Sequence, residues 1–327
     1  MLTSRTRKFE LDEIVQGILS GRAQWLSRGI TLVESQLAND HVLSSELLKR
    51  LLSHTGGGLR IGITGVPGVG KSTFIEAFGT MLTESGKRVA VLSIDPSSAR
   101  SKGSILGDKT RMGELSMNPN AFIRPSPSGN SLGGVANSTR ESILLCEAAG
   151  FEVVIVETVG VGQSETLVKD MVDYFLLLML PGSGDELQGI KRGIMEMADG
   201  LFINKADGNM ERAKRARKDF QNALHLFPPT AANWQVPVDI GSALEKTGME
   251  DVWKHIEKFA AHTRSNGWFD QNRKDQEIKW FRQLIRQRLE NDFFSSKTTA
   301  EKIKKAEDMI SSAQVSARGA VDFLFAN

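Results

Sequence analysis

Eight residues in the first quarter of the chain have the types and spacing needed to hold a phosphate chain. They are Gly65-Val66-Pro67-Gly68-Val69-Gly70-Lys71-Ser72, followed by Thr73, and they match the P-loop pattern G-x-x-x-x-G-K-[ST]. Glycines let a backbone bend closely around phosphate oxygens, because they adopt positive φ and carry no Cβ. Lys71 would reach the β- and γ-phosphates, and the Ser72 hydroxyl would be offered to Mg²⁺. The motif predicts a bound nucleoside triphosphate.

A second motif predicts which base is bound. Asn204-Lys205-Ala206-Asp207 matches N-K-x-D, the guanine-specificity pattern of GTPases, and follows an apolar, strand-like run. The Asp207 carboxylate can accept hydrogen bonds from guanine N1–H and the exocyclic amine, whereas adenine offers no such donor pair. A polar mismatch of this kind can discriminate by about 10⁴ in favourable sites. Lys205 would lie along the base, and Ser242-Ala243-Leu244 resembles the loop whose backbone contacts guanine O6. We therefore expect GTP rather than ATP.

Several carboxylates that follow two further apolar runs are candidates for contacts to Mg²⁺. Glu157 to Gly160 stands where GTPases place D-x-x-G, although Glu replaces the usual Asp. The Glu157 carboxylate would position Mg²⁺ through water, and the Gly160 amide would sense the γ-phosphate. Asp95 and Asp108 are candidates for contacts to Mg²⁺ or to the catalytic water. The alternative is that Asp95 caps a turn and Asp108 caps the next helix.

Two loops are predicted to respond to the nucleotide or to a partner. Val161 to Glu165 is a predicted switch, in which Gln163 is a candidate for orienting the attacking water. Pro181 to Lys191 is rich in glycine and carries Asp185, Gln188 and Lys191, so we expect a third switch or a partner-contact loop. The basic run Arg212 to Lys218 has no aromatic platform beside it, so it predicts a solvated helix face rather than an RNA site.

The elements that must position these motifs alternate regularly along the chain. Strand-like apolar runs recur between helical stretches, at Leu59–Thr64, Arg88–Ile94, Val153–Glu157, Tyr174–Leu180, Gly200–Asn204 and Val236–Ile240. This alternation predicts an α/β fold with a doubly wound, mostly parallel sheet, in which ligands bind beyond the carboxyl ends of the strands.

Helical segments flank that region on both sides. Leu11, Ile14, Val15, Ile18 and Leu19 share one helical face, Arg22–Ser35 is a second helix, and Glu46–Leu52 is a third with Ser44 or Ser45 as its cap. After residue 262, Ile278 and Phe281 begin another apolar stripe, which packs either on a partner subunit or on its own chain. We expect an N-terminal helical extension over 1–56, a P-loop GTPase domain over 57–262 and a C-terminal helical arm over 263–327.

The composition of the chain argues against several classes of protein. The chain has 327 residues and a formal net charge of +2, which gives no general case for a nucleic-acid or membrane partner. Its one cysteine, Cys146, rules out an internal disulfide and a cysteine-based zinc site, and it is predicted to be a buried small hydrophobe. No apolar run approaches the roughly 18 residues of a membrane span, and the N-terminus has no apolar signal region. We expect a soluble, cytoplasmic protein.

Longer stretches of the sequence resemble one family. The chain is similar to MeaB/ArgK-type P-loop GTPases, the G-protein chaperones associated with methylmalonyl-CoA mutase, and to the human methylmalonic aciduria type A protein. The resemblance covers nearly the whole chain and runs through the stretches GITGVPGVGKST, SIDPSSARSKGSILGDKTRM, ETVGVGQSE, LPGSGDELQGIKRGIMEMADG and NKAD.

The resemblance implies a function that the motifs alone do not. Family members hydrolyse GTP to GDP slowly alone and faster with their mutase, form homodimers through a C-terminal arm, gate adenosylcobalamin delivery to the mutase and protect it. The residues implied at the phosphates and Mg²⁺ are Lys71, Ser72, Asp95, Asp108 and Glu157. Those implied in the second and third switches are Gln163, Asp185, Gln188 and Lys191, and those at the base are Asn204, Lys205 and Asp207.

Two other classes of protein are alternatives. A metallochaperone GTPase of the UreG or HypB kind usually displays a His-rich tail or a Cys/His cluster, whereas this chain has one cysteine and scattered histidines. A transport-linked, ATP-dependent protein kinase, the older ArgK label, conflicts with N-K-A-D. The sequence leaves open the client mutase, the hydrolysis rate, the dimer geometry and the nucleotide state. It also leaves open whether Asp95, Asp108 or Gln163 positions the attacking water.

Overall fold

The computed structural model describes residues 4–94, 112–125, 132–158, 164–182 and 192–325. The chain forms two compact units, Met1–Asp270 and Gln271–Asn327. The predicted division into 1–56, 57–262 and 263–327 remains a prediction. Among the described residues, no helix is both long enough and apolar enough to cross a membrane.

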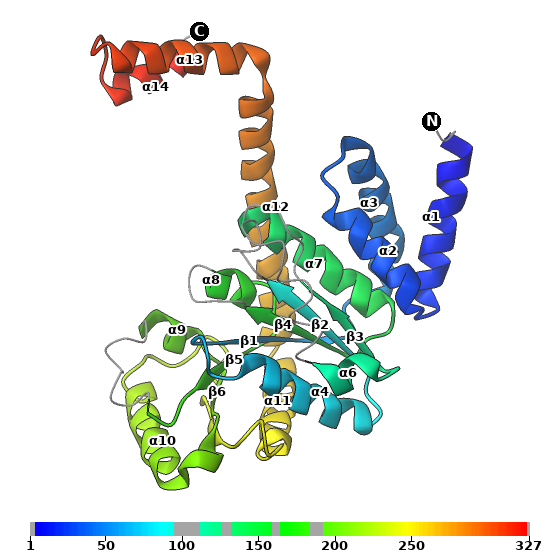
Figure 1. The fold of residues 1–327 in the computed structure, drawn as a ribbon, viewed down its shortest axis with the longest axis vertical. Coiled ribbons are helices and arrows are strands. Elements are labelled where there is room, and N and C mark those ends of the chain that lie inside the picture. The colour runs from blue at the N-terminus through cyan, green and yellow to red at the C-terminus, as the bar shows by residue number, and fades with distance from the viewer. Residues whose placement is uncertain (1–3, 95–111, 126–131, 159–163, 183–191, 326–327) are drawn as a thin grey trace. The chain divides into compact units, whose positions relative to one another are not determined.

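A seven-stranded sheet forms the centre of the first unit, in the order β3-β2-β4-β1-β5-β6-β7 (Figure 1). Its named strands pair in parallel throughout, and the predicted doubly wound α/β fold is confirmed. The strands are β1 (Leu59–Gly65), β2 (Val89–Ile94), β3 (Ala121–Arg124), β4 (Val153–Thr158), β5 (Tyr174–Met179), β6 (Gly200–Ile203) and β7 (Val238–Ile240). The sequence does not predict β3, because this strand has only four residues, and only its two central residues are buried.

Helices cover both faces of this sheet, because alternate strand residues point to opposite sides. In β2, Val91 joins the core under α4 (Lys71–Glu84) and α11 (Met249–Ser265). Leu92 joins the core on the other face, under α7 (Leu132–Ala148) and α8 (Ser164–Lys169). The remaining elements around the sheet are α6 (Gly113–Met117), α9 (Arg192–Met197), α10 (Met210–Leu224) and the 3₁₀ turns η1 (Leu52–His54) and η2 (Ala206–Gly208).

The N-terminal helices share the core of the sheet. They are α1 (Ser4–Leu19), α2 (Ala23–Glu34) and α3 (Ala38–Leu51), and Figure 1 shows α2 and α3 beside α7. Leu11, Ile14, Val15 and Ile18 are buried in one cluster with residues of β2 and β4, as their helical spacing predicts. The predicted cap at Ser44 or Ser45 is wrong, because α3 begins at Ala38 and has no side-chain cap. Packing against α2 and α7 supports the earlier start.

A buried ion pair joins β1 to α7. Arg60 Nε and Nη2 donate to Glu147 Oε1 and Oε2 at 2.8 and 2.9 Å. The Gly56 N–H also donates to Glu147 Oε2, at 2.8 Å. The Glu147 side chain is fully buried. Two charges removed from water in this way stabilise a fold only while both partners remain.

The second unit contains most of α12 (Trp268–Ser295), with α13 (Lys297–Ser311) and α14 (Ala317–Phe325). Phe293 stacks on Phe325 with ring centroids 5.2 Å apart, and Ala306 and Ala320 are buried. The predicted apolar stripe of α12 is largely exposed, with Phe281 and Leu289 at 62% and 64%. Its role as a dimerisation arm remains a prediction.

Candidate nucleotide site

The predicted phosphate loop connects the end of β1 to the start of α4, as the motif requires. Gly68 and Gly70 have φ of 78° and 96°, the left-handed region that favours glycine. A methyl group at Gly70 would lie 2.8 Å from Asn204 Nδ2. Gly70 is therefore required both by its backbone conformation and by the close approach of the N-K-x-D loop.

Lys71 is directed back along its own loop. Its Nζ donates to the Gly65 carbonyl at 2.8 Å, and burial lowers the pKa of the ammonium group. The negative charges of Glu157 and Glu165 oppose that effect and raise the same pKa. The partly desolvated ammonium group of Lys71 thus lies in the electrostatic field of two carboxylates. The sequence predicted a metal-binding role for Glu157, whereas it placed Glu165 only at the end of the predicted switch Val161 to Glu165.

Asn204 joins three of the predicted motifs through one buried amide. Its Nδ2 donates to the Val69 carbonyl, and its Oδ1 accepts from the Ala243 N–H, both at 2.9 Å. Lys205 adds a further link, because its Nζ donates to the Gly68 carbonyl at 2.8 Å. The sequence predicted Asn204 and Lys205 as base-binding residues. In the structure both side chains form hydrogen bonds to the predicted phosphate loop, so the predicted base and phosphate loops are directly connected.

The remaining base-binding candidates lie close by. Asp207 is exposed in η2, which is held by a hydrogen bond from the Ala206 N–H to the Gly241 carbonyl at 3.1 Å. Ser242 and Thr247 close the next loop through reciprocal backbone hydrogen bonds of 3.2 and 2.9 Å. The Asp207 carboxylate is thus open to a ligand, while the loops around it are fixed. Its binding of guanine remains a prediction.

Ser72 and Glu157 offer a donor set suited to Mg²⁺. The Ser72 hydroxyl donates to Glu157 Oε1 at 3.4 Å, and Glu157 is only 3% exposed at the end of β4. A hydroxyl and a carboxylate supply the oxygen ligands that Mg²⁺ prefers, with water and substrate phosphates completing its coordination. The residues therefore fit the predicted ion.

The other predicted residues lie outside the described part of the chain. They are Asp95, Asp108, Gly160, Gln163, Asp185, Gln188 and Lys191. Their roles in metal binding, water positioning and switching stay predictions.

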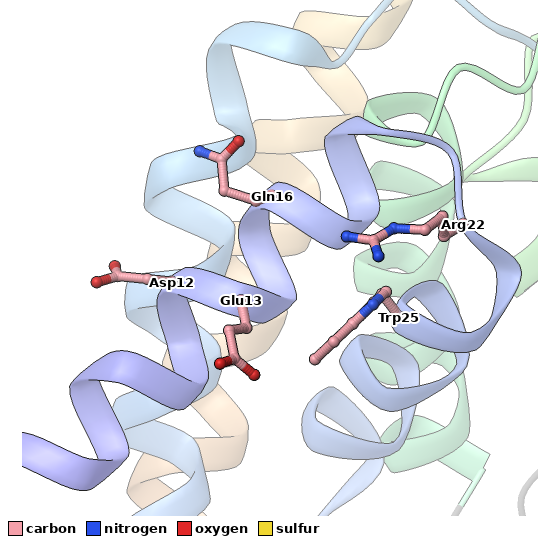
Figure 2. Close-up of a pocket in the computed structure, with 5 residues that line it drawn as sticks. All are labelled: Asp12, Glu13, Gln16, Arg22 and Trp25. Atoms are coloured by element: carbon pink, nitrogen blue, oxygen red, sulfur yellow. The ribbon is translucent and has the colours of Figure 1, made fainter.

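A separate cavity of 430 Å³ lies on the N-terminal helices and is lined by Asp12, Glu13, Gln16, Arg22 and Trp25. Figure 2 shows these side chains on α1, on α2 and on the turn between them. The Arg22 guanidinium lies 5.7 Å from the centre of the Trp25 ring. None of the lining residues belongs to the phosphate, base or metal motifs, so this cavity is distinct from the candidate nucleotide site.

Comparison with known proteins identifies the family. Residues 26–298 match the model of the family described as "Methylmalonyl Co-A mutase-associated GTPase MeaB". A "Putative GTPase" of Caulobacter vibrioides is 51% identical over 97% of this chain and 97% of its own length. "GTPase ArgK" of Escherichia coli is 46% identical over 88% of this chain and 87% of its own length.

Two further relatives extend the comparison. The "Methylmalonic aciduria type A homolog, mitochondrial" of Mus musculus is 42% identical over 99% of this chain and 80% of its own length. The solved structure of an "LAO/AO transport system kinase" has a TM-score of 0.77 and 36% identity, and the match covers 99% of this chain and 98% of that one. The resemblance seen in the sequence is thereby confirmed. The chain belongs to the MeaB family, and it is a GTPase that binds guanine nucleotides.

Proposed function

We propose that this GTPase gates adenosylcobalamin delivery to a cobalamin-dependent acyl-CoA mutase and protects that enzyme, with methylmalonyl-CoA mutase as the first candidate. The observation that carries the proposal is the match of residues 26–298 to a family described as mutase-associated. The relationship to a methylmalonic aciduria type A homolog over 99% of the chain supports the same client.

In this proposal each of the described site residues binds a different part of the Mg²⁺-bound nucleotide. Lys71 neutralises phosphate charge, Asp207 accepts from the guanine base, and Ser72 and Glu157 hold Mg²⁺. When bound, the ion would neutralise negative charge on the phosphate oxygens. The Asn204 bridge from Val69 to Ala243 makes base and phosphate recognition interdependent. Slow turnover by the chain alone follows if a partner must complete the catalytic arrangement.

We also propose that the chain acts as a homodimer through its arm over 263–327. The exposed apolar side chains of α12, including Phe281 and Leu289, support this proposal, because contiguous apolar surface on a soluble domain usually marks an interaction site.

The test of the client is GTP turnover with and without purified methylmalonyl-CoA mutase. We expect the mutase to bind the GTP-loaded chain and to raise kcat, because binding of a partner can complete a catalytic arrangement. An unrelated dehydrogenase at the same concentration is the control. Absence of both binding and stimulation, also with a second cobalamin-dependent acyl-CoA mutase, would refute the client assignment without touching GTPase activity.

The test of base recognition is Asp207→Asn. The amide keeps the size of the side chain but loses one acceptor and the negative charge. We expect GTP affinity to fall about 10- to 100-fold while ATP affinity is unchanged, since hydrogen bonds to charged groups contribute roughly 1.5–3 kcal/mol. Xanthosine triphosphate, whose C2 carbonyl can accept from the new amide, should bind the variant better than the parent. Unchanged preference for GTP over ATP would contradict the assignment.

A further inference from the structure

Ser93 carries a buried hydroxyl group for which the sequence predicts no role. It lies next to the carboxyl end of β2 and is only 3% exposed. Among the described residues, its Oγ has no hydrogen-bond partner. Burying a hydroxyl group without a hydrogen bond costs free energy, so such a group in a folded protein calls for an explanation. The residues around Ser93 indicate what its hydroxyl binds.

The register of the sheet pairs Ser93 with Glu157. β2 and β4 are parallel neighbours, and the Cα atoms of these two residues are partners across the pair. Neighbouring strands lie about 4.8 Å apart in the hydrogen-bonding direction. Because paired residues project their side chains from the same face of a sheet, the side chains of Ser93 and Glu157 leave adjacent backbones on the same side.

That side is the face covered by α4. In β2, Val91 belongs to the core cluster under α4, whereas Leu92 belongs to the cluster on the other face. Ser93 therefore faces α4, since successive residues of a strand alternate. Ser72, in the first turn of α4, donates its hydroxyl to Glu157 Oε1 at 3.4 Å. Two hydroxyl groups, one from α4 and one from β2, thus lie on the same face as the carboxylate of the candidate Mg²⁺ site.

We propose that Ser93 Oγ is a second anchor for the water molecule through which Glu157 holds Mg²⁺, so that Ser93 sets the affinity of the site for the ion. This inference rests on the Mg²⁺ site proposed above. Mg²⁺ usually keeps several of its waters in proteins, and each such water has two hydrogens to donate. One is donated to the Glu157 carboxylate and the other to Ser93 Oγ, which a hydroxyl oxygen can accept. Ser93 is thus a positioning residue that acts through water.

The experiment is Ser93→Ala, with Mn²⁺ as a paramagnetic substitute for Mg²⁺. The dissociation constant of the ion from the GDP-loaded protein is measured by electron paramagnetic resonance. We expect the variant to bind Mn²⁺ about ten-fold more weakly, because loss of a group that orients the ligands of a metal typically costs roughly 10–100-fold in affinity. GDP affinity in the presence of EDTA should stay the same. The Tm of the metal-free protein should be unchanged or higher, since alanine removes a buried hydroxyl that lacks a partner.

Ser142→Ala is the matched control. Ser142 lies in α7 and is also 3% exposed, but its hydroxyl donates to the Ser138 carbonyl at 2.7 Å. It is thus an equally buried hydroxyl with a partner of its own. Because α7 covers the opposite face of the sheet, this variant should bind Mn²⁺ as the parent does.

The outcomes separate this inference from the site on which it rests. If the GDP-loaded parent binds no Mn²⁺, the proposed metal site itself is wrong. If the parent binds Mn²⁺ and Ser93→Ala binds it equally well, the role of Ser93 is wrong and the metal site stands. Weaker binding together with a lower Tm of the metal-free protein would show a structural role and would also contradict the proposal. If the alanine variant does not fold, Ser93→Cys, whose sulfur is a weak acceptor, is measured in its place with the same expected loss.

Discussion

Replacing Lys71 with alanine is expected to reduce GTP hydrolysis by about 100-fold or more, with a parallel loss of tight GTP binding. The Lys71 ammonium group lies inside the phosphate loop, where its Nζ is 2.8 Å from the Gly65 carbonyl oxygen. Removing a single preorganised donor from a charge-stabilising site typically costs 10²–10³ in rate. Alanine also leaves Glu157 and Glu165 without the cation that offsets their repulsion of phosphate. Single-turnover hydrolysis and equilibrium GTP binding are the measurements.

A matched control distinguishes this effect from a general loss of charge or fold. Lys49→Ala removes an exposed lysine from α3, outside the nucleotide motifs, and should leave rate and affinity unchanged. The Lys71→Ala variant should keep its Tm within a few degrees, because its main hydrogen bond is local to the loop. Normal hydrolysis by a folded Lys71→Ala protein would refute the assignment of the P-loop as the phosphate site.

Replacing Glu147 with alanine is expected to destabilise the first unit by about 3–5 kcal/mol, the usual cost of removing one partner of a buried ion pair. Arg60 would lose the carboxylate that binds it at 2.8 and 2.9 Å, and the Gly56 N–H would lose its acceptor. This pair lies at the amino edge of the sheet, away from the predicted nucleotide site. Its loss should therefore lower the free energy of unfolding with little effect on nucleotide affinity. Urea unfolding followed by circular dichroism measures the change.

The surface pair between Asp12 and Arg50 provides the control. It is as short as the buried pair, at 2.7 Å, but its side chains are 44% and 32% exposed. Asp12→Ala should therefore cost less than about 1 kcal/mol, since solvent screens such pairs. Replacing both Arg60 and Glu147 with apolar residues of similar size should restore much of the lost stability, because no buried charge then remains unpaired. A Glu147→Ala protein as stable as Asp12→Ala would show that burial does not govern this pair.

Local patterns explain why so much could be predicted from the sequence. The P-loop works within one turn between β1 and α4, so the identity and order of its residues are sufficient to predict it. Strands such as β5 are continuous apolar runs, which is typical of parallel strands covered on both faces. The helical face of α1 repeats at i, i+3 and i+4, and its residues are buried as predicted.

Contacts between distant parts of the chain could not be predicted in the same way. Asn204 bonds to Val69 across 135 residues and to Ala243 across 39, and it is the strand order that brings the three together. The start of α3 and the existence of β3 likewise depend on packing that no local pattern records. The amino-acid sequence by itself thus determined the nucleotide class, the family and the alternation of strands and helices. Only the tertiary structure decided that the Asn204 amide joins the predicted base and phosphate loops, because sheet order is a property of the folded chain.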